Sequence, residues 1–119
     1  MNADELEDRT KKFALRIIKL VESLPRTFVA LHIGKQLLKA GTSVAANYRA
    51  ARRARSKNEF NSKLSIVVEE ADESVFGMEM LIDAGIVKKE LLVDLIPEGT
   101  EILKIMSRSR KTAKQNHPA

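Results

Sequence analysis

The sequence predicts an all-α fold, an antiparallel up-down-up-down four-helix bundle, from the spacing of its apolar residues and the positions of its helix breakers. Gly (5) and Pro (3) are too scarce for the many tight turns of an all-β fold. Pro25, Gly85 and the Pro97/Gly99 pair separate stretches in which apolar residues recur every three or four positions. The length of 119 residues fits a single domain, 1–119, built from four helices with short connections.

The first helix is expected from about Asp4 to Ser23. Its apolar stripe advances by four, three and four residues through Phe13, Ile17, Leu20 and Leu24. Carboxylates gather at its start, where they interact favourably with the helix dipole. Pro25 ends the helix, because the residue before a proline is pushed out of the α region.

The second helix is expected from about Phe28 to Arg55, with Thr27 as its N-cap. Gly34 and Gly41 lie one heptad apart and therefore share a face. Each costs about 1 kcal/mol in a helix interior, so the pair favours the close approach of another backbone. The alternative is that one of the two glycines breaks the segment into two shorter helices.

The third helix begins with a capping box, in which Ser56 is the N-cap and Glu59 follows three positions later. It runs to Ala84, and Gly85 is the expected C′ residue. The fourth helix is expected as two pieces, about 88–95 and 98–112, because Pro97 should kink or split it. Residues from about 112 to 119 are expected to form a flexible basic tail.

Composition excludes several classes of protein. A hydrophobic fraction of 44% is too high for a disordered chain, and the absence of Cys rules out disulfide scaffolds, iron–sulfur clusters and thiol catalysis. No run reaches the ~20 apolar residues that span a bilayer, and the N-terminus is acidic, unlike a targeting peptide. We therefore expect a soluble, cytoplasmic protein without membrane association.

Catalytic and metal-binding patterns are hard to find. The only histidines are His32 and His117, and neither has the Glu three positions earlier that bundle di-iron sites use. The sequence contains no Gly-rich phosphate loop and no dinucleotide fingerprint. We expect no enzymatic activity, no metal and no cofactor.

Two polar sets are predicted to have structural roles. Gln36, Ser43 and Asn47 lie at intervals of seven and four, a spacing at which polar residues fix helix register or oligomeric state. The third helix carries an acidic cluster, Glu69, Glu70, Asp72 and Glu73. Salt bridges to another helix or subunit are favoured for this cluster, and a divalent ion or a shared proton is the alternative.

Charge is segregated along the chain, whose net charge is +5. Residues 49–63 hold six basic residues and one acidic residue, and residues 104–119 hold five basic residues and no acidic one. Each segment is thus +5 and the remainder is −5. Arginine forks suit phosphate groups, so nucleic-acid binding is the sharper hypothesis. Pairing with an acidic surface of another helix or subunit, or a merely solvated face, are the alternatives.

The predicted phosphate contacts form two strips. The first is Arg49, Arg52, Arg53, Arg55 and Lys57, and the second is Arg108, Arg110 and Lys111. No arrangement suited to reading bases is visible and aromatic residues are nearly absent there, so binding to RNA or DNA is expected to be independent of sequence. The alternative function is a structural or adaptor protein that binds a protein partner through the bundle surface.

Four runs of the sequence form a recognisable set: Gln36-Leu37-Leu38, Gly41-Thr42-Ser43-Val44-Ala45-Ala46-Asn47, Ser56 with Phe60 and Lys63-Leu64, and Glu69-Glu70-Ala71-Asp72-Glu73-Ser74. As a set they resemble the "four helix bundle protein" family, first known as proteins encoded by intervening sequences in bacterial 23S ribosomal RNA genes. The sequence departs from the family at Gly77, where a Trp is usual, and in the basic run after Asn47, where an acidic residue is common.

The resemblance implies an antiparallel four-helix bundle, a ring-shaped homopentamer and no known enzymatic activity. The family is also similar to the accessory variability proteins of diversity-generating retroelements. Those proteins are pentameric and basic, and they bind nucleic acid and a reverse transcriptase. By analogy, the resemblance adds RNA or DNA and a reverse transcriptase to the expected partners.

Overall fold

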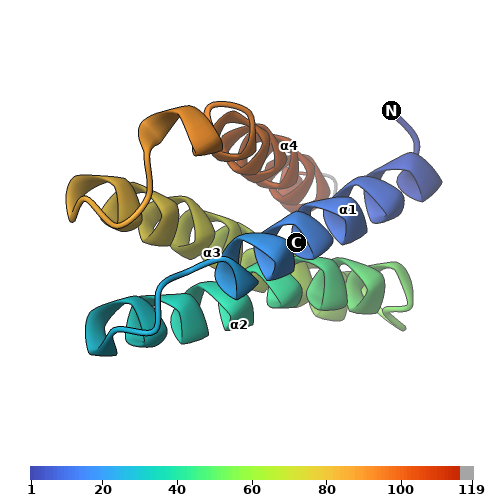
Figure 1. Cartoon of the computed structure of the whole chain (residues 1–119). Helices are drawn as coiled ribbons and strands as arrows, with labels where there is room; N and C mark the ends of the chain where they lie inside the picture. Colours follow the sequence, from blue (N-terminus) through green and yellow to red (C-terminus); the bar gives the residue numbers. More distant parts are fainter. Residues whose placement is uncertain (116–119) are drawn as a thin grey trace.

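The computed structural model of the protein describes the backbone of residues 1–115 and the side chains of residues 1–112. It consists of α1 (Ala3–Glu22), α2 (Phe28–Arg52), α3 (Lys57–Asp83), the 3-10 helix η1 (Lys89–Leu92) and α4 (Leu95–Gln115), and it has no strand among these residues. Figure 1 shows the helices as an elongated bundle of 50 × 22 × 22 Å, which confirms the predicted all-α fold. None of the described helices combines the length and apolarity needed to cross a bilayer.

The predicted tail falls partly inside the last helix. Residues 112–115 belong to α4, while residues 116–119, with His117, lie outside the described residues. Asn2 is the N-cap of α1, because its side chain accepts a hydrogen bond from the Glu5 amide at 2.8 Å.

α2 is one continuous helix, so the alternative of a break at a glycine is wrong. The Thr27 hydroxyl accepts a hydrogen bond from the Ala30 amide at 3.2 Å, which confirms the predicted N-cap. The helix ends at Arg52 rather than near Arg55. The amides of Arg53 and Ala54 bond three residues back, to Ala50 and Ala51, and this tighter turn closes the helix.

The capping box at the start of α3 is confirmed, with one shift. The Ser56 hydroxyl accepts from the Glu59 amide at 3.1 Å. The Glu59 carboxylate accepts in return from the amide of Arg55, one residue before the expected Ser56. Gly85 follows α3 with a φ of +73°, the left-handed conformation that ends many helices and that glycine adopts without strain.

The split in the last helical region lies at residues 93–94, just before Pro97. Pro97 itself falls in the first turn of α4, where the missing N–H would have no helical partner, so the proline does not kink the helix. η1 forms the shorter piece, and α4 continues unbroken to Gln115.

Neighbouring helices pack closely, and glycine lies in each contact. A Cβ placed on Gly41 of α2 would lie 2.8 to 3.0 Å from three atoms of Ile17 in α1. On α3, a Cβ at Gly77 would lie 3.3 Å from Leu37 of α2, and on α4 one at Gly99 would lie 3.0 Å from Val75 of α3. The helices joined by these contacts are antiparallel, and their shared core includes Phe13, Ile17, Leu37, Val67, Met78 and Ile102.

α1 and α4 meet through a charged contact. The Arg9 guanidinium donates two hydrogen bonds to the Glu98 carboxylate, both at 2.7 Å, and each side chain is about three-quarters covered. The hydrogen bond to Glu98 is the main cause of the raised pKa of Arg9. This bidentate pair links α1 to α4.

The close contact at Gly41 yields a stability test. Gly41→Ala should lower the free energy of unfolding by about 1 kcal/mol net, because overpacking against Ile17 costs about 1–3 kcal/mol and the better helix propensity of Ala returns about 1 kcal/mol. Gly77→Ala is the matched control. Its new methyl would meet the flexible end of Leu37, so stability should stay equal or rise. Urea denaturation checks both, and equal losses in the two variants would contradict the packing argument.

Candidate nucleic-acid interface and the α2/α3 groove

Antiparallel packing brings the two basic segments to one end of the bundle. The first segment covers the end of α2, the turn after it and the start of α3. The second lies near the end of α4, and because α4 runs opposite to α3, its end lies beside the start of α3. Figure 1 shows the green α2–α3 turn and the N-terminal turn of α1 at this same end. We call this region the basic end, and define it by Arg49, Arg52, Arg53, Arg55, Lys57, Arg108, Arg110 and Lys111.

One arginine of the basic end is already engaged. Arg52 donates from Nη2 to Asp4 at 2.8 Å and from Nη1 to Glu7 at 3.2 Å, joining the end of α2 to the start of α1. The hydrogen bond to Asp4 is the main cause of its raised pKa. Asp4 and Glu7, which lie near the positive end of the α1 dipole, therefore also interact with Arg52. The sequence signal for this contact was the opposite charge of the start of α1 and the end of α2, two adjacent antiparallel helices.

Several other cations of the basic end remain unpaired in the described part of the chain. Arg49, Arg53 and Lys57 are exposed, and no carboxylate among residues 1–112 lies within ion-pair distance of them. Arg55 lies 3.8 Å from Glu59, with 92% of its side chain exposed. On α4, Arg108 and Lys111 are exposed and Arg110 is half-buried. Their positive charge is therefore available to an external anion.

The predicted structural polar residues separate into two places. The Asn47 amide donates to the carbonyl oxygen of Ser43 at 2.9 Å, a contact within α2. Gln36 lies on α2 opposite Glu70 and Glu73 of α3, in a groove between the two helices. Glu69, by contrast, is exposed and is not among the lining residues of that groove.

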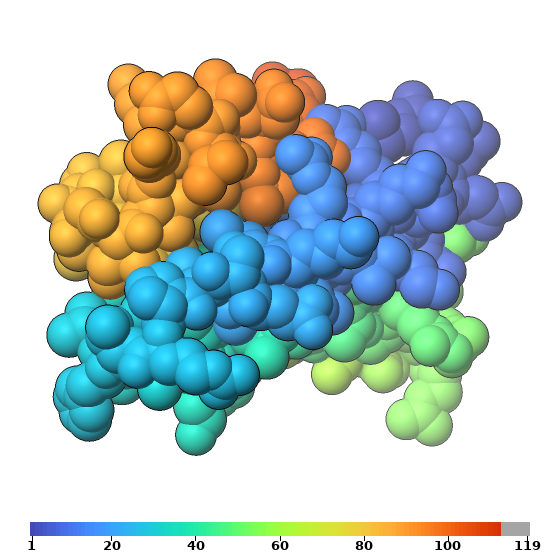
Figure 2. Space-filling view, viewed as in Figure 1, coloured from blue at the N-terminus to red at the C-terminus, as the bar shows by residue number. Residues whose placement is uncertain are grey.

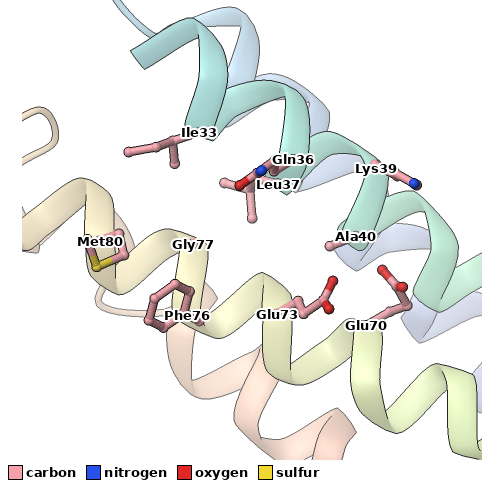
Figure 3. Close-up of a pocket in the computed structure, with 10 residues that line it drawn as sticks. All are labelled: Ile33, Gln36, Leu37, Lys39, Ala40, Glu70, Glu73, Phe76, Gly77 and Met80. Carbon is pink, nitrogen blue, oxygen red and sulfur yellow. The ribbon is translucent and has the colours of Figure 1, made fainter. Parts of the chain in front are cut away.

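The α2/α3 groove is a feature that sequence reasoning missed. Its volume is about 650 Å³, and ten residues line it: Ile33, Gln36, Leu37, Lys39, Ala40, Glu70, Glu73, Phe76, Gly77 and Met80. Figure 3 shows the carboxylates of Glu70 and Glu73 turned toward α2. Phe76 is 62% exposed and Met80 is 38% exposed, so apolar surface adjoins the carboxylates. The one sequence signal was Gly77, which leaves space where the resembling family has a Trp.

Electrostatics in the groove centre on Glu70. Burial raises the pKa of its carboxyl, and the neighbouring Glu73 and Glu69 raise it further, while Lys39 acts in the opposite direction. Within the described residues no three His, Cys, Asp or Glu side chains converge on a point that could hold a metal ion. Among the described residues, no Lys or Arg lies within ion-pair distance of Glu69, Glu70 or Glu73, so the predicted salt bridges to another helix do not form there.

The raised pKa of Glu70 gives a pH-dependent prediction. Ionised Glu70 is less favourable in the folded chain than in the unfolded one, so stability should fall as pH rises from the unfolded pKa through the folded pKa. Glu70→Gln should raise the free energy of unfolding at pH 7, and this gain should vanish below about pH 4, where the carboxyl is protonated in both states. Urea denaturation at both pH values measures it, with Glu79→Gln, an exposed residue of α3 outside the groove, as the control. A gain independent of pH would contradict the assignment.

Comparisons with known proteins support the four-helix fold and show the family. The family model of the 23S rRNA-intervening sequence protein matches residues 5–108. A crystal structure of a protein of unknown function from the S23 ribosomal protein family, from Bacteroides thetaiotaomicron, superposes with a TM-score of 0.84 at 33% sequence identity, covering 93% of this chain and 99% of that one. The curated proteins contain no significant match. The match over most of the chain shows that this protein belongs to the 23S rRNA-intervening sequence protein family.

Proposed function

We propose that this protein is a non-enzymatic homo-oligomer that binds RNA or DNA through backbone phosphates at its basic end. One observation carries the proposal. Eight basic residues from two segments of the sequence, which are separated by most of α3 and by η1, come together at one end of the bundle. A cluster of arginines and lysines on one surface is the electrostatic footprint of phosphate binding.

The unpaired cations support this proposal further. Arg49, Arg53 and Lys57 have no carboxylate partner among the described residues, so binding a polyanion costs them no existing ion pair. Arg52 differs, because it would have to leave Asp4 and Glu7. Contacts to phosphate carry no sequence information, so the expected binding is independent of base sequence.

The α2/α3 groove supports the oligomeric part of the proposal. An exposed Phe76 and a half-exposed Met80 beside carboxylates make a surface of mixed character, as protein–protein contacts have. A second copy of the chain is the proposed occupant, and five copies is the number that the family resemblance implies. Assembly would multiply a weak phosphate site by avidity.

The second candidate function is an adaptor that binds a different protein through the same groove. The groove, with its mixed apolar and acidic lining, would then receive that partner, and nucleic acid would play no part. A reverse transcriptase is the proposed partner, because the sequence resembles the accessory variability proteins, which bind one. Nucleic-acid binding and protein binding are separated by two experiments.

The first experiment measures binding of a fluorescent single-stranded RNA and DNA by anisotropy between 50 and 200 mM salt. With about four phosphate contacts, affinity should fall about 10- to 100-fold over this range. The double variant Arg108→Glu/Lys111→Glu should bind at least about tenfold more weakly. Lys88→Glu/Lys89→Glu makes the same charge change around the start of η1, away from the basic end, and should have a much smaller effect. Affinity independent of salt, or equal losses in both variants, would overturn the proposed site.

The second experiment tests the groove as the contact between copies. Phe76→Asp should raise the dissociation constant of the oligomer about 30-fold or more, because a central apolar contact of an interface contributes about 2 kcal/mol. Leu15→Asp is the control, since Leu15 is also an exposed apolar residue but lies on α1 outside the groove. Light scattering across a concentration series gives the mass. A monomeric wild-type protein, or dissociation by both variants alike, would count against the groove.

A further inference from the structure

A second concave site lies between α1 and α2. Its volume is about 520 Å³, and eight residues line it: Glu7, Lys11, Ala14, Thr42, Ala45, Ala46, Arg49 and Arg53. We call it the α1/α2 pocket. Figure 2 shows the blue surface of α1 lying over the teal and green surface of α2, the two helices that form its walls. The pocket reaches the basic end through Arg49 and Arg53 and adds a cation from α1, Lys11, that lies outside both basic segments of the sequence.

Small side chains give the pocket its depth. Ala14 of α1 is buried, and Ala45 and Ala46 of α2 add only a methyl group each. Longer side chains at these positions would fill the space between the helices. Three cations surround these small residues: Arg49 in the last turn of α2, Arg53 directly after the helix ends, and Lys11 on the α1 side.

The charge balance of the pocket is positive. Glu7 is the one carboxylate that lines it, and its Oε1 already accepts a hydrogen bond from Arg52, a residue outside the lining. Lys11, Arg49 and Arg53 have no carboxylate within ion-pair distance in the described part of the chain. A concave wall with three such cations concentrates positive potential on the space that it encloses.

We propose that the α1/α2 pocket binds backbone phosphates of the nucleic acid, with Arg49 and Arg53 on one wall and Lys11 on the other. Guanidinium forks can each take two phosphate oxygens, while the Lys11 ammonium acts as a point charge. A volume of about 520 Å³ lies within the ordinary range for ligand pockets, about 300–1,000 Å³, and accommodates more than a single phosphate group. This proposal rests on the proposed function and places one stretch of the bound strand between α1 and α2.

Adjacent lysines provide a matched test. Lys12 neighbours Lys11 on α1 but pairs with Asp8 at 2.9 Å and is not part of the pocket. In anisotropy titrations with single-stranded RNA, Lys11→Gln should weaken binding several-fold and reduce the slope of log K against log salt by about 0.7. Lys12→Gln should change neither quantity appreciably. Equal effects in the two variants would overturn the pocket and leave the proposed function standing.

A volume test keeps the charge constant. Ala46 is exposed, and Leu is a good helix former, so Ala46→Leu should fold normally while filling the pocket. RNA affinity should fall several-fold with all cations present. Unchanged affinity in a folded Ala46→Leu variant would contradict a bound group inside the pocket.

Pyrophosphate separates the pocket from nucleic-acid binding. In NMR titrations of the full chain with pyrophosphate, the methyl signals of Ala14, Ala45 and Ala46 should shift, and Lys11→Gln should reduce the shift. If pyrophosphate binds there but RNA and DNA do not bind the protein at all, the anion site holds for small phosphates and the proposed function fails. If RNA binds and no pocket methyl shifts with either RNA or pyrophosphate, the pocket proposal fails alone.

Discussion

Close packing at glycines is the constraint on which the rest of the structure depends. α1 can lie against α2 because Gly41 leaves room for Ile17, and glycines also lie where α2 meets α3 and where α3 meets α4, with less crowding at Gly77 than at Gly41 or Gly99. A glycine in a helix interior costs stability relative to Ala, by about 1 kcal/mol. The chain offsets this cost through the tighter burial of large core side chains such as Phe13 and Ile17.

The distance between α1 and α2 also determines the electrostatics of the basic end. Because α1 lies close to α2, Asp4 and Glu7 reach Arg52, and Lys11 shares a pocket with Arg49 and Arg53. The packing of α1 on α2 therefore divides the arginines at the end of α2 into one that is paired with carboxylates and two that line the pocket. Arg52 joins the end of α2 to the start of α1, while Arg49 and Arg53 have no carboxylate partner among the described residues.

Helices, caps and core were predictable from the sequence because they depend on local spacing. The Ser56–Glu59 capping box and Gly85 lie within a few residues of their partners, and so the pattern alone located them. The end of α2 was misplaced by three residues, because residues 53–55 contain no Gly or Pro that would mark the turn closing the helix. The α2/α3 groove and the α1/α2 pocket could not be predicted, because they depend on which side chains from two helices face each other. Lys11 carries no signal in the sequence that links it to Arg49.

The placement of the basic segments at a single end has a consequence for any ring built from this chain. A rotation axis keeps every copy at the same height, so the positively charged ends of all copies lie at one level along that axis. The other end carries exposed apolar residues instead, among them Phe28, Leu91 and Val93. In a ring whose axis runs along the bundles, the two faces differ, and one of them carries a circle of basic ends. A strand held on that circle would bend around the axis and leave the opposite face free for a second molecule.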